Sequence, residues 1–309
     1  HFLEREFGKN RADRLQPVMQ EAYRLAYIRK PEFMGNTRTE EKDPKFKVIS
    51  DLPWCEQEIN ERLAAYRQLS DKVEQEWHAL PAQKKETYFQ LVKYPVQAAA
   101  QMNNKLLTAQ LARHGKADWA DSDRAYDSIV SLTKTYNTTK WNRMMDFQPR
   151  RLLVFNRVER KALSSGLLEK PQAVYTWNGA DCVEGASVIC EGLGYEGKAV
   201  AVEKKKELTF EFAAWETDSV EVEVRLLPNH PVEGERLRFT ISLDGSATEA
   251  VSYETKGRSE EWKENVLCNQ AVRRMILPVA RKASHRLIFT ALDEGVVLDQ
   301  ICLYMPRIK

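Results

Sequence analysis

The chain has 309 residues, a length that suggests about two domains. Its 47 basic and 45 acidic residues leave a net charge of +2, which gives no electrostatic case for binding nucleic acid or an anionic membrane. Hydrophobic residues make up 43% of the chain, enough for real cores, and no apolar run approaches the roughly 18 residues of a membrane span.

The first predicted element is an amphipathic helix that ends before Pro31. Its apolar residues follow the three- and four-residue spacing of one buried helix face: Leu15, Val18, Met19, Ala22, Tyr23 and Ala26. Nothing between His1 and this helix could form the fold on which that face should pack. We therefore expect the chain to be the back part of a larger protein, with residues 1–36 ending an upstream domain.

Residues 37–145 predict an antiparallel helical bundle. Residues 50–53, Ser-Asp-Leu-Pro, are typical of an N-cap followed by proline in the first helical turn. The helix that follows carries apolar residues in alternating steps of four and three, a heptad seam. The seam consists of Ile59, Leu63, Tyr66, Ser70, Val73, Trp77 and Leu80.

Two further helices complete the predicted bundle. The first runs from about Ala82 to Arg113, is kinked by Pro95 and ends at Gly115 in a C′ position. The second is capped by Asp121 and Ser122, and one face carries Ala125, Ile129, Leu132 and Tyr136.

Beyond residue 145 the sequence changes character. Residues 146–172 contain prolines and charges and are interpreted as a linker that partly packs. From residue 173 to 309 the apolar period becomes two, and the short alternating runs predict an antiparallel β-sandwich. The clearest runs are residues 208–212, 220–224, 237–243, 284–290 and 296–304. Asp244-Gly245 follows one of them and predicts a hairpin turn.

The sequence offers no catalytic or metal-binding motif. It has no nucleophile motif, no phosphate-binding glycine loop, and five histidines without ligand spacing, so we predict neither a metal nor a cofactor. The five cysteines are sparse and form no CxxC pair, which argues against a disulfide framework and a structural zinc site. They are Cys55, Cys182, Cys190, Cys268 and Cys302. No pair of carboxylates stands out as a glycosidase acid and base.

One segment, residues 253–265, concentrates side chains that suit a sugar ligand. Aromatic rings stack on pyranose faces, and arginine pairs with carboxylates in a bidentate manner. Because the segment follows a strand and contains a glycine, we expect an edge loop of the sandwich. The substrate-contact candidates are Tyr253, Arg258, Trp262 and Asn265. The alternative is structural, with Trp262 packed in the sandwich and Arg258 in a surface ion pair.

Three stretches together resemble glycoside hydrolase family 115, the xylan α-glucuronidases. They are Arg-Lys-Pro-Glu-Phe-Met-Gly-Asn at 29–36, Tyr-Pro-Val-Gln-Ala-Ala-Ala-Gln-Met-Asn at 94–103, and Pro-Asn-His-Pro at 228–231 with residues 258–267. They occur in the order of that family's barrel end, helical bundle and C-terminal sandwich.

The resemblance implies a function for the whole protein rather than for this chain. It implies that residues 1–36 end a (β/α)8 catalytic barrel, which carries the acid and base, so no catalytic residue is expected here. The implied reaction is inverting removal of α-1,2-linked (4-O-methyl)glucuronic acid from glucuronoxylan. It further implies a secreted or periplasmic bacterial protein, with the upstream barrel, glucuronoxylan and a second subunit of a homodimer as partners.

Two other readings of the residues stay open. One is a stand-alone carbohydrate-binding or adhesion module without catalysis, and the other is a structural protein whose helices bind a partner. The helix at the start of the chain, which lacks a fold to pack on, favours the enzyme.

Overall fold

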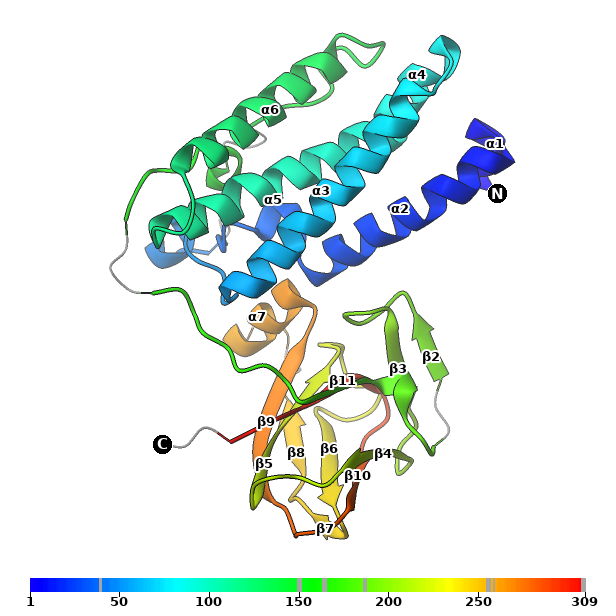
Figure 1. The fold of residues 1–309 in the computed structure, drawn as a ribbon, viewed down its shortest axis with the longest axis vertical. Coiled ribbons are helices and arrows are strands. Elements are labelled where there is room, and N and C mark those ends of the chain that lie inside the picture. Colours follow the sequence, from blue (N-terminus) through cyan, green and yellow to red (C-terminus); the bar gives the residue numbers. More distant parts are fainter. Residues whose placement is uncertain are drawn as a thin grey trace. The chain divides into compact units, whose positions relative to one another are not determined.

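The computed structural model describes residues 1–38, 41–148, 152–162, 166–185, 188–253, 257 and 259–306. The chain divides into two compact units, His1–Lys170 and Pro171–Lys309. The first unit is helical and the second is built mainly of strands (Figure 1). The predicted succession of a helical bundle and an antiparallel β-sandwich is therefore confirmed.

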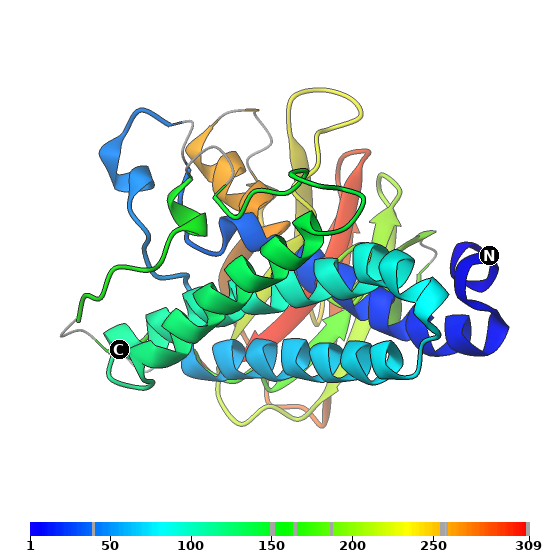
Figure 2. The same ribbon diagram turned by 90° about the horizontal axis from the view of Figure 1, so that it is seen from above.

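The long helices of the first unit lie side by side in both views (Figures 1 and 2). Helix α5 packs on α3 and on α6, and α2 packs on α3. The helical elements are α1 (Phe2–Phe7), α2 (Lys9–Ile28), η1 (Pro31–Phe33), η2 (Pro44–Lys47), α3 (Glu56–His78), α4 (Ala82–Tyr88), η3 (Phe89–Lys93), α5 (Tyr94–Arg113), α6 (Trp119–Asn137) and η5 (Leu153–Phe155).

The buried face of α3 is wider than the predicted heptad seam. Four seam residues are fully buried: Ile59, Tyr66, Val73 and Leu80. Leu63 and Trp77 are only half-buried. Two residues outside the seam, Arg62 and Leu69, are buried instead. Helix α3 contacts α2 on one side and α5 on another, so its buried residues cover more of its surface than a single apolar stripe.

The predicted cap of α3 at residues 50–53 is wrong. The helix begins at Glu56, and the carboxylate of Glu58 accepts the backbone N–H of Cys55 at 2.8 Å. Residues 50–53 form no regular secondary structure, and Leu52 is bonded to α5. The N–H of Leu52 donates to the side-chain oxygen of Gln110 at 3.0 Å, and the Gln110 amide donates back to the Leu52 carbonyl at 2.9 Å.

The predicted cap of α6 at residues 121–122 is also wrong. The helix begins at Trp119, and the Asp118 carboxylate accepts the N–H of Ala120 at 2.9 Å. Ser122 lies within the helix and is buried, and its hydroxyl donates to the Lys105 carbonyl at 2.7 Å.

The predicted helix over residues 82–113 is present but interrupted. A π-helical turn, η3, joins α4 to α5, and Pro95 occupies the first turn of α5. The missing N–H of proline costs least in a first turn. The predicted C′ position of Gly115 is confirmed by its φ of +70°, and the N–H of Lys116 donates to the Leu111 carbonyl at 2.9 Å.

The stretch 29–36 is held together by a buried arginine. Arg29 is 1% exposed, and its Nε donates to the carbonyl of Phe33 at 2.8 Å. Its Nη2 donates to the side-chain oxygen of Asn36 at 3.2 Å. These contacts fix the turn after α2, which explains the residue types at these positions.

A second buried arginine joins this turn to α5. Arg62 of α3 donates from Nη2 to the Arg29 carbonyl at 2.8 Å and from Nε to the Asn103 side chain at 2.6 Å. The stretches 29–36 and 94–103 therefore meet through α3 inside the helical unit.

The sandwich consists of two antiparallel sheets. The first has the strand order β2-β3-β11-β5-β9, with β1 also paired to β11, and the second has β4-β10-β6-β7, with β8 also paired to β6. The strands are β1 (Tyr175–Asn178), β2 (Val188–Glu191), β3 (Lys198–Val202), β4 (Glu207–Ala213), β5 (Ser219–Leu226), β6 (Leu237–Leu243), β7 (Ser246–Ala247), β8 (Val251–Tyr253), β9 (Ala271–Pro278), β10 (Ser284–Ala291) and β11 (Val296–Tyr304).

The alternating runs predicted these strands because their apolar residues form the core between the sheets. Strand β5 contributes Val220, Val222, Val224 and Leu226 to that core. The hairpin turn is also confirmed, since Asp244 and Gly245 have φ values of +51° and +92° between β6 and β7.

The burial pattern of α3 yields a stability prediction. Ile59→Ala should reduce the free energy of unfolding by about 2–5 kcal/mol, because it leaves a cavity at a fully buried position. Leu63→Ala, one turn further along, should cost clearly less because Leu63 is half-buried. Urea unfolding of both variants measures the difference, and equal losses would contradict the burial described here.

Candidate functional site

The described residues of the predicted substrate-contact segment include Tyr253 at the end of β8 and part of a short helix, α7 (Glu260–Cys268), where we expected an edge loop. The Ser259 hydroxyl caps α7 by accepting the N–H of Trp262 at 3.2 Å. Glu260 and Glu261 occupy the first turn, where carboxylates favour a helix. Asn269 ends the helix in the left-handed conformation.

The structure places the four candidate residues differently. Tyr253 is 2% exposed and belongs to the sandwich core. Trp262 and Asn265 are half-buried on α7, and Arg258 lies outside the described residues. The indole of Trp262 stacks on the ring of His230, with centroids 5.4 Å apart and an interplanar angle of 24°. The stack joins the segment to the loop that contains residues 228–231.

These residues carry polar atoms that the rest of the described chain does not satisfy. The hydroxyl of Tyr253, the indole Nε1 of Trp262 and the amide nitrogen of Asn265 are buried and have no hydrogen-bond partner among the described residues. All three groups can donate, and the indole and the amide nitrogen can only donate, so a ligand or neighbour that satisfies these two must supply acceptor atoms. Burial raises the pKa of Tyr253, which keeps its phenol neutral and able to donate.

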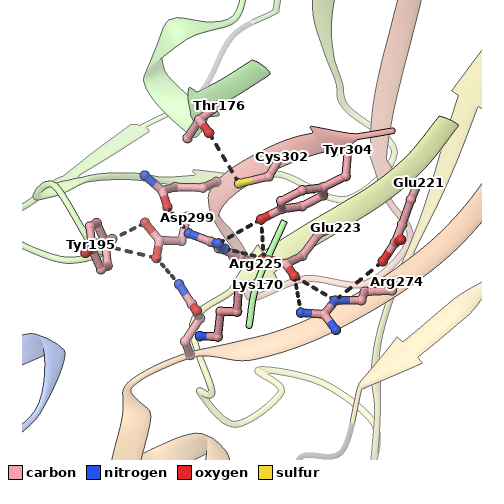
Figure 3. A network of polar contacts seen from close by, with 12 residues as sticks. Lys170, Thr176, Tyr195, Glu221, Glu223, Arg225, Arg274, Asp299, Cys302 and Tyr304 are labelled. Carbon is pink, nitrogen blue, oxygen red and sulfur yellow. Dashed lines mark hydrogen bonds and ion pairs between the residues drawn. The ribbon is translucent and has the colours of Figure 1, made fainter. Parts of the chain in front are cut away.

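A second polar cluster covers the outer face of the first sheet (Figure 3). Its centre is Glu223 on β5, whose side chain is 3% exposed. Glu223 accepts from Nε of Arg225 at 2.6 Å and from Nε of Arg274 at 2.7 Å. Arg225 also donates to the side-chain oxygen of Gln300 at 2.8 Å. The cluster therefore ties together three neighbouring strands, β9, β5 and β11.

The charges in this cluster compensate one another. Burial alone would raise the pKa of Glu223, but Arg225 and Arg274 lower it below its usual value. A carboxylate held by two guanidinium groups is a poor proton acceptor, so Glu223 is not suited to be a general base. The cluster holds the sheet together.

Asp299 anchors a neighbouring turn to the same sheet. It lies at an irregularity in the pairing of β11 with β5. Its carboxylate accepts the N–H of Tyr195 at 2.9 Å and the side-chain amide of Gln270 at 3.1 Å. A side chain at Gly194 would come within 2.4 Å of this carboxylate, so only glycine fits there. Burial raises the pKa of Asp299.

The outer-face cluster was not predicted from the sequence. The run Val-Glu-Val-Glu-Val at 220–224 predicted a strand with alternating apolar and polar residues, and alternation alone does not indicate that Glu223 is buried. The only signal was the number of arginines in the paired strand, with Arg273 and Arg274 on β9. Within the described ranges no group of three or more metal-ligating side chains gathers. No described helix is both long and apolar enough to cross a membrane.

Comparisons with known proteins decide the family. Residues 186–309 match the glycosyl hydrolase family 115 C-terminal domain. A solved structure, described as a family GH115 4-O-methyl-alpha-glucuronidase with specificity for decorated arabinogalactans, aligns with 99% of this chain at 61% identity and a TM-score of 0.96. The chain belongs to glycoside hydrolase family 115. It spans 41% of the length of that family 115 structure.

Other solved structures are far more distant. An exo-beta-1,3-galactanase from Phanerochaete chrysosporium matches over 42% of this chain and 29% of its own, at 16% identity and a TM-score of 0.32. A carbohydrate binding module from Cellvibrio mixtus lichenase 5A matches over 44% and 100%, at 13% identity and a TM-score of 0.34. Likenesses at this level bear on neither fold nor function here. A comparison with curated proteins finds no match.

The charge cluster around Glu223 predicts a pH-dependent contribution to stability. Glu223→Gln should lower the free energy of unfolding by about 3 kcal/mol at neutral pH, because it leaves two guanidinium groups without their carboxylate. The Glu223 pKa is lower in the folded state than in the unfolded chain, so this stability is present above about pH 4.3 and is lost as pH falls through the folded pKa. The difference in the free energy of unfolding between wild type and Glu223→Gln should therefore become smaller at acidic pH.

Glu221→Gln is the matched control for this experiment. Glu221 lies on the same strand, and its carboxylate lies 3.9 Å from Nε of Arg274, beyond hydrogen-bond distance. Glu221→Gln should therefore lower the free energy of unfolding much less than Glu223→Gln. Urea unfolding of the three proteins from pH 3 to pH 7 compares them, and a gap that widens in acid would contradict the assignment.

Proposed function

We propose that this chain is the C-terminal accessory part of an α-glucuronidase of family 115. The observation that carries the proposal is the 61% identity over 99% of the chain to a 4-O-methyl-alpha-glucuronidase. We propose that the parent protein places its catalytic acid and base in a (β/α)8 barrel upstream, and that residues 1–36, whose helix α2 packs on α3, lead from the end of this barrel into the helical unit.

The chemistry proposed for the parent is hydrolysis with inversion. One carboxylic acid protonates the leaving oxygen and one carboxylate activates water, with the two groups about 6.5–9.5 Å apart. Among the described residues, the most buried glutamate, Glu223, is held by two arginines and suits neither role. This supports an accessory role, in which the chain supports the barrel and shapes its surroundings.

The proposed substrate is a polysaccharide that carries (4-O-methyl)glucuronic acid side groups. The 61% identical relative is described as specific for decorated arabinogalactans, which makes that polymer the first substrate to assay. Glucuronoxylan with α-1,2-linked side groups, the substrate implied by the sequence resemblance, is the second. Because polymers of this kind do not cross membranes, we propose a secreted or periplasmic location. We also propose a homodimer.

The accessory role predicts that the chain alone and its parent protein differ in activity. The 309-residue chain alone should release no 4-O-methylglucuronic acid from decorated arabinogalactan or glucuronoxylan, whereas the parent should release it from at least one. Chromatography of the released acid measures both. A chain that is active alone would overturn the accessory role, and a parent that binds these polymers without cleaving either would favour a carbohydrate-binding protein.

The substrate role of the segment 253–265 also has a test in the parent. Tyr253→Phe keeps the buried ring and removes only a hydroxyl without a partner, so the melting temperature should hold. If this hydroxyl or the Arg258 side chain orients substrate, Tyr253→Phe or Arg258→Ala should reduce kcat/KM at least tenfold. Val266→Ala, on the exposed side of α7, is the control. Unchanged kcat/KM in both test variants would show that the segment has a structural role and does not orient substrate.

A further inference from the structure

Residues 152–160, here called the strap, lie along the helical unit after its last helix. Val154 and Val158 are 1% and 5% exposed and belong to the same core as Leu106 and Leu107 of α5. The strap, which is part of the predicted linker at 146–172, therefore lies on the bundle.

The inner attachment of the strap is a buried lysine of α5. Lys105 is 0% exposed, and its Nζ donates to the carbonyls of Val154 at 2.6 Å and of Asn156 at 2.8 Å. From α6, the ring of Tyr126 faces the same nitrogen, with its centroid 5.8 Å away. Within the described part of the chain no carboxylate contacts this amine.

The outer attachment consists of exposed ion pairs. Arg157 donates to Asp123 at 2.8 Å and to Asp127 at 2.6 Å, and Arg160 donates to Asp123 at 2.5 Å. The guanidinium of Arg157 also lies 4.6 Å from the Tyr126 ring centroid, so a positive charge lies against this ring. Exposed pairs of this kind contribute little and weaken in salt. The buried contacts of Lys105 and the two valines therefore carry most of the attachment.

The two states of the strap differ in how strongly Lys105 binds a proton. With the strap in place, burial lowers the pKa of Lys105 to about 7. With the strap released, the amine meets water, where a lysine pKa is about 10.4. Between these two values the released state binds one more proton than the closed state. The closed state therefore gains stability as pH rises from about 7 to about 10 and changes little below 7.

We propose that the strap is a proton-sensitive latch, in which proton uptake by Lys105 promotes release of residues 152–160 from α5 and α6. The strap precedes the junction between the two units at residues 170 and 171. Beyond the strap, Leu167 packs on the same core and Lys170 pairs with Glu58 at 2.9 Å, so the chain stays attached to the helical unit when the strap is released. Release of the strap exposes Lys105 and removes Val154 and Val158 from the core of the helical unit.

Amide hydrogen exchange of the 309-residue chain tests the latch. The peptide covering 152–160 should gain protection roughly tenfold per pH unit between pH 8 and pH 10, after correction for intrinsic exchange rates. A peptide from residues 106–113 of α5 is the internal reference and should show no such gain. Equal pH dependence in both peptides, or none in the strap, would overturn the proposal without any variant.

Lys105→Met is the matched variant, because methionine fills much of the same space and cannot titrate. Its strap should exchange faster than that of wild type at pH 9.5, and its protection should not change with pH. A variant strap that keeps the wild-type pH dependence would show that another group is responsible. Arg157→Ala should speed exchange of the strap at every pH while leaving the slope unchanged, which separates the outer ion pairs from the buried amine.

Discussion

Helix α5 sets the main constraint on the helical unit, because it buries polar side chains along with apolar ones. Asn103, Lys105, Gln110 and Arg113 are all at most 7% exposed. Each needs a partner, since an unsatisfied buried polar group costs about 1–3 kcal/mol. Asn103 pairs with Arg62 of α3, which also bonds the turn after α2. The partners of Lys105, Gln110 and Arg113 lie in connecting segments, the strap and residues 51–52. The polar groups of α5 thus determine where the connecting segments lie.

The first sheet of the sandwich also buries polar groups that need partners. Its inner face is apolar, and its outer face carries Glu223 between two arginines on neighbouring strands. Asp299 extends the arrangement by holding the turn at Tyr195 and the residue Gln270, which follows α7. The pair between Glu223 on β5 and Arg274 on β9 favours one strand register, because a slip of one residue between these strands would separate the two side chains. The segment with the sugar-contact candidates is therefore mounted on a well-anchored sheet.

Sequence periodicity predicted the elements with one apolar face and failed where tertiary contacts took over. The strands around residues 208–212 and 220–224 were predictable because alternation alone defines them. The caps at residues 50–53 and 121–122 were mispredicted because their side chains and backbone serve α5 instead. Helix α7 was missed although Ser259, Glu260 and Glu261 form a capped, acidic first turn. The pairing of Arg62 with Asn103 was beyond prediction, because it depends on residues 41 positions apart meeting in the interior.

The contact of Arg29, Arg62 and Asn103 has a consequence for how these positions can vary. Arg62 donates to both the Arg29 carbonyl and the Asn103 side chain, so one side chain holds the turn after α2 and helix α5 together. A change at Asn103 leaves a buried guanidinium without one acceptor, and a change at Arg62 leaves two segments without their shared donor. A single substitution at Arg62 or Asn103 should therefore destabilise the fold, and a substitution at one position should be tolerated best together with a matching substitution at the other. In related sequences positions 62 and 103 should covary, although they lie on different helices, whereas position 29 offers Arg62 only its backbone carbonyl.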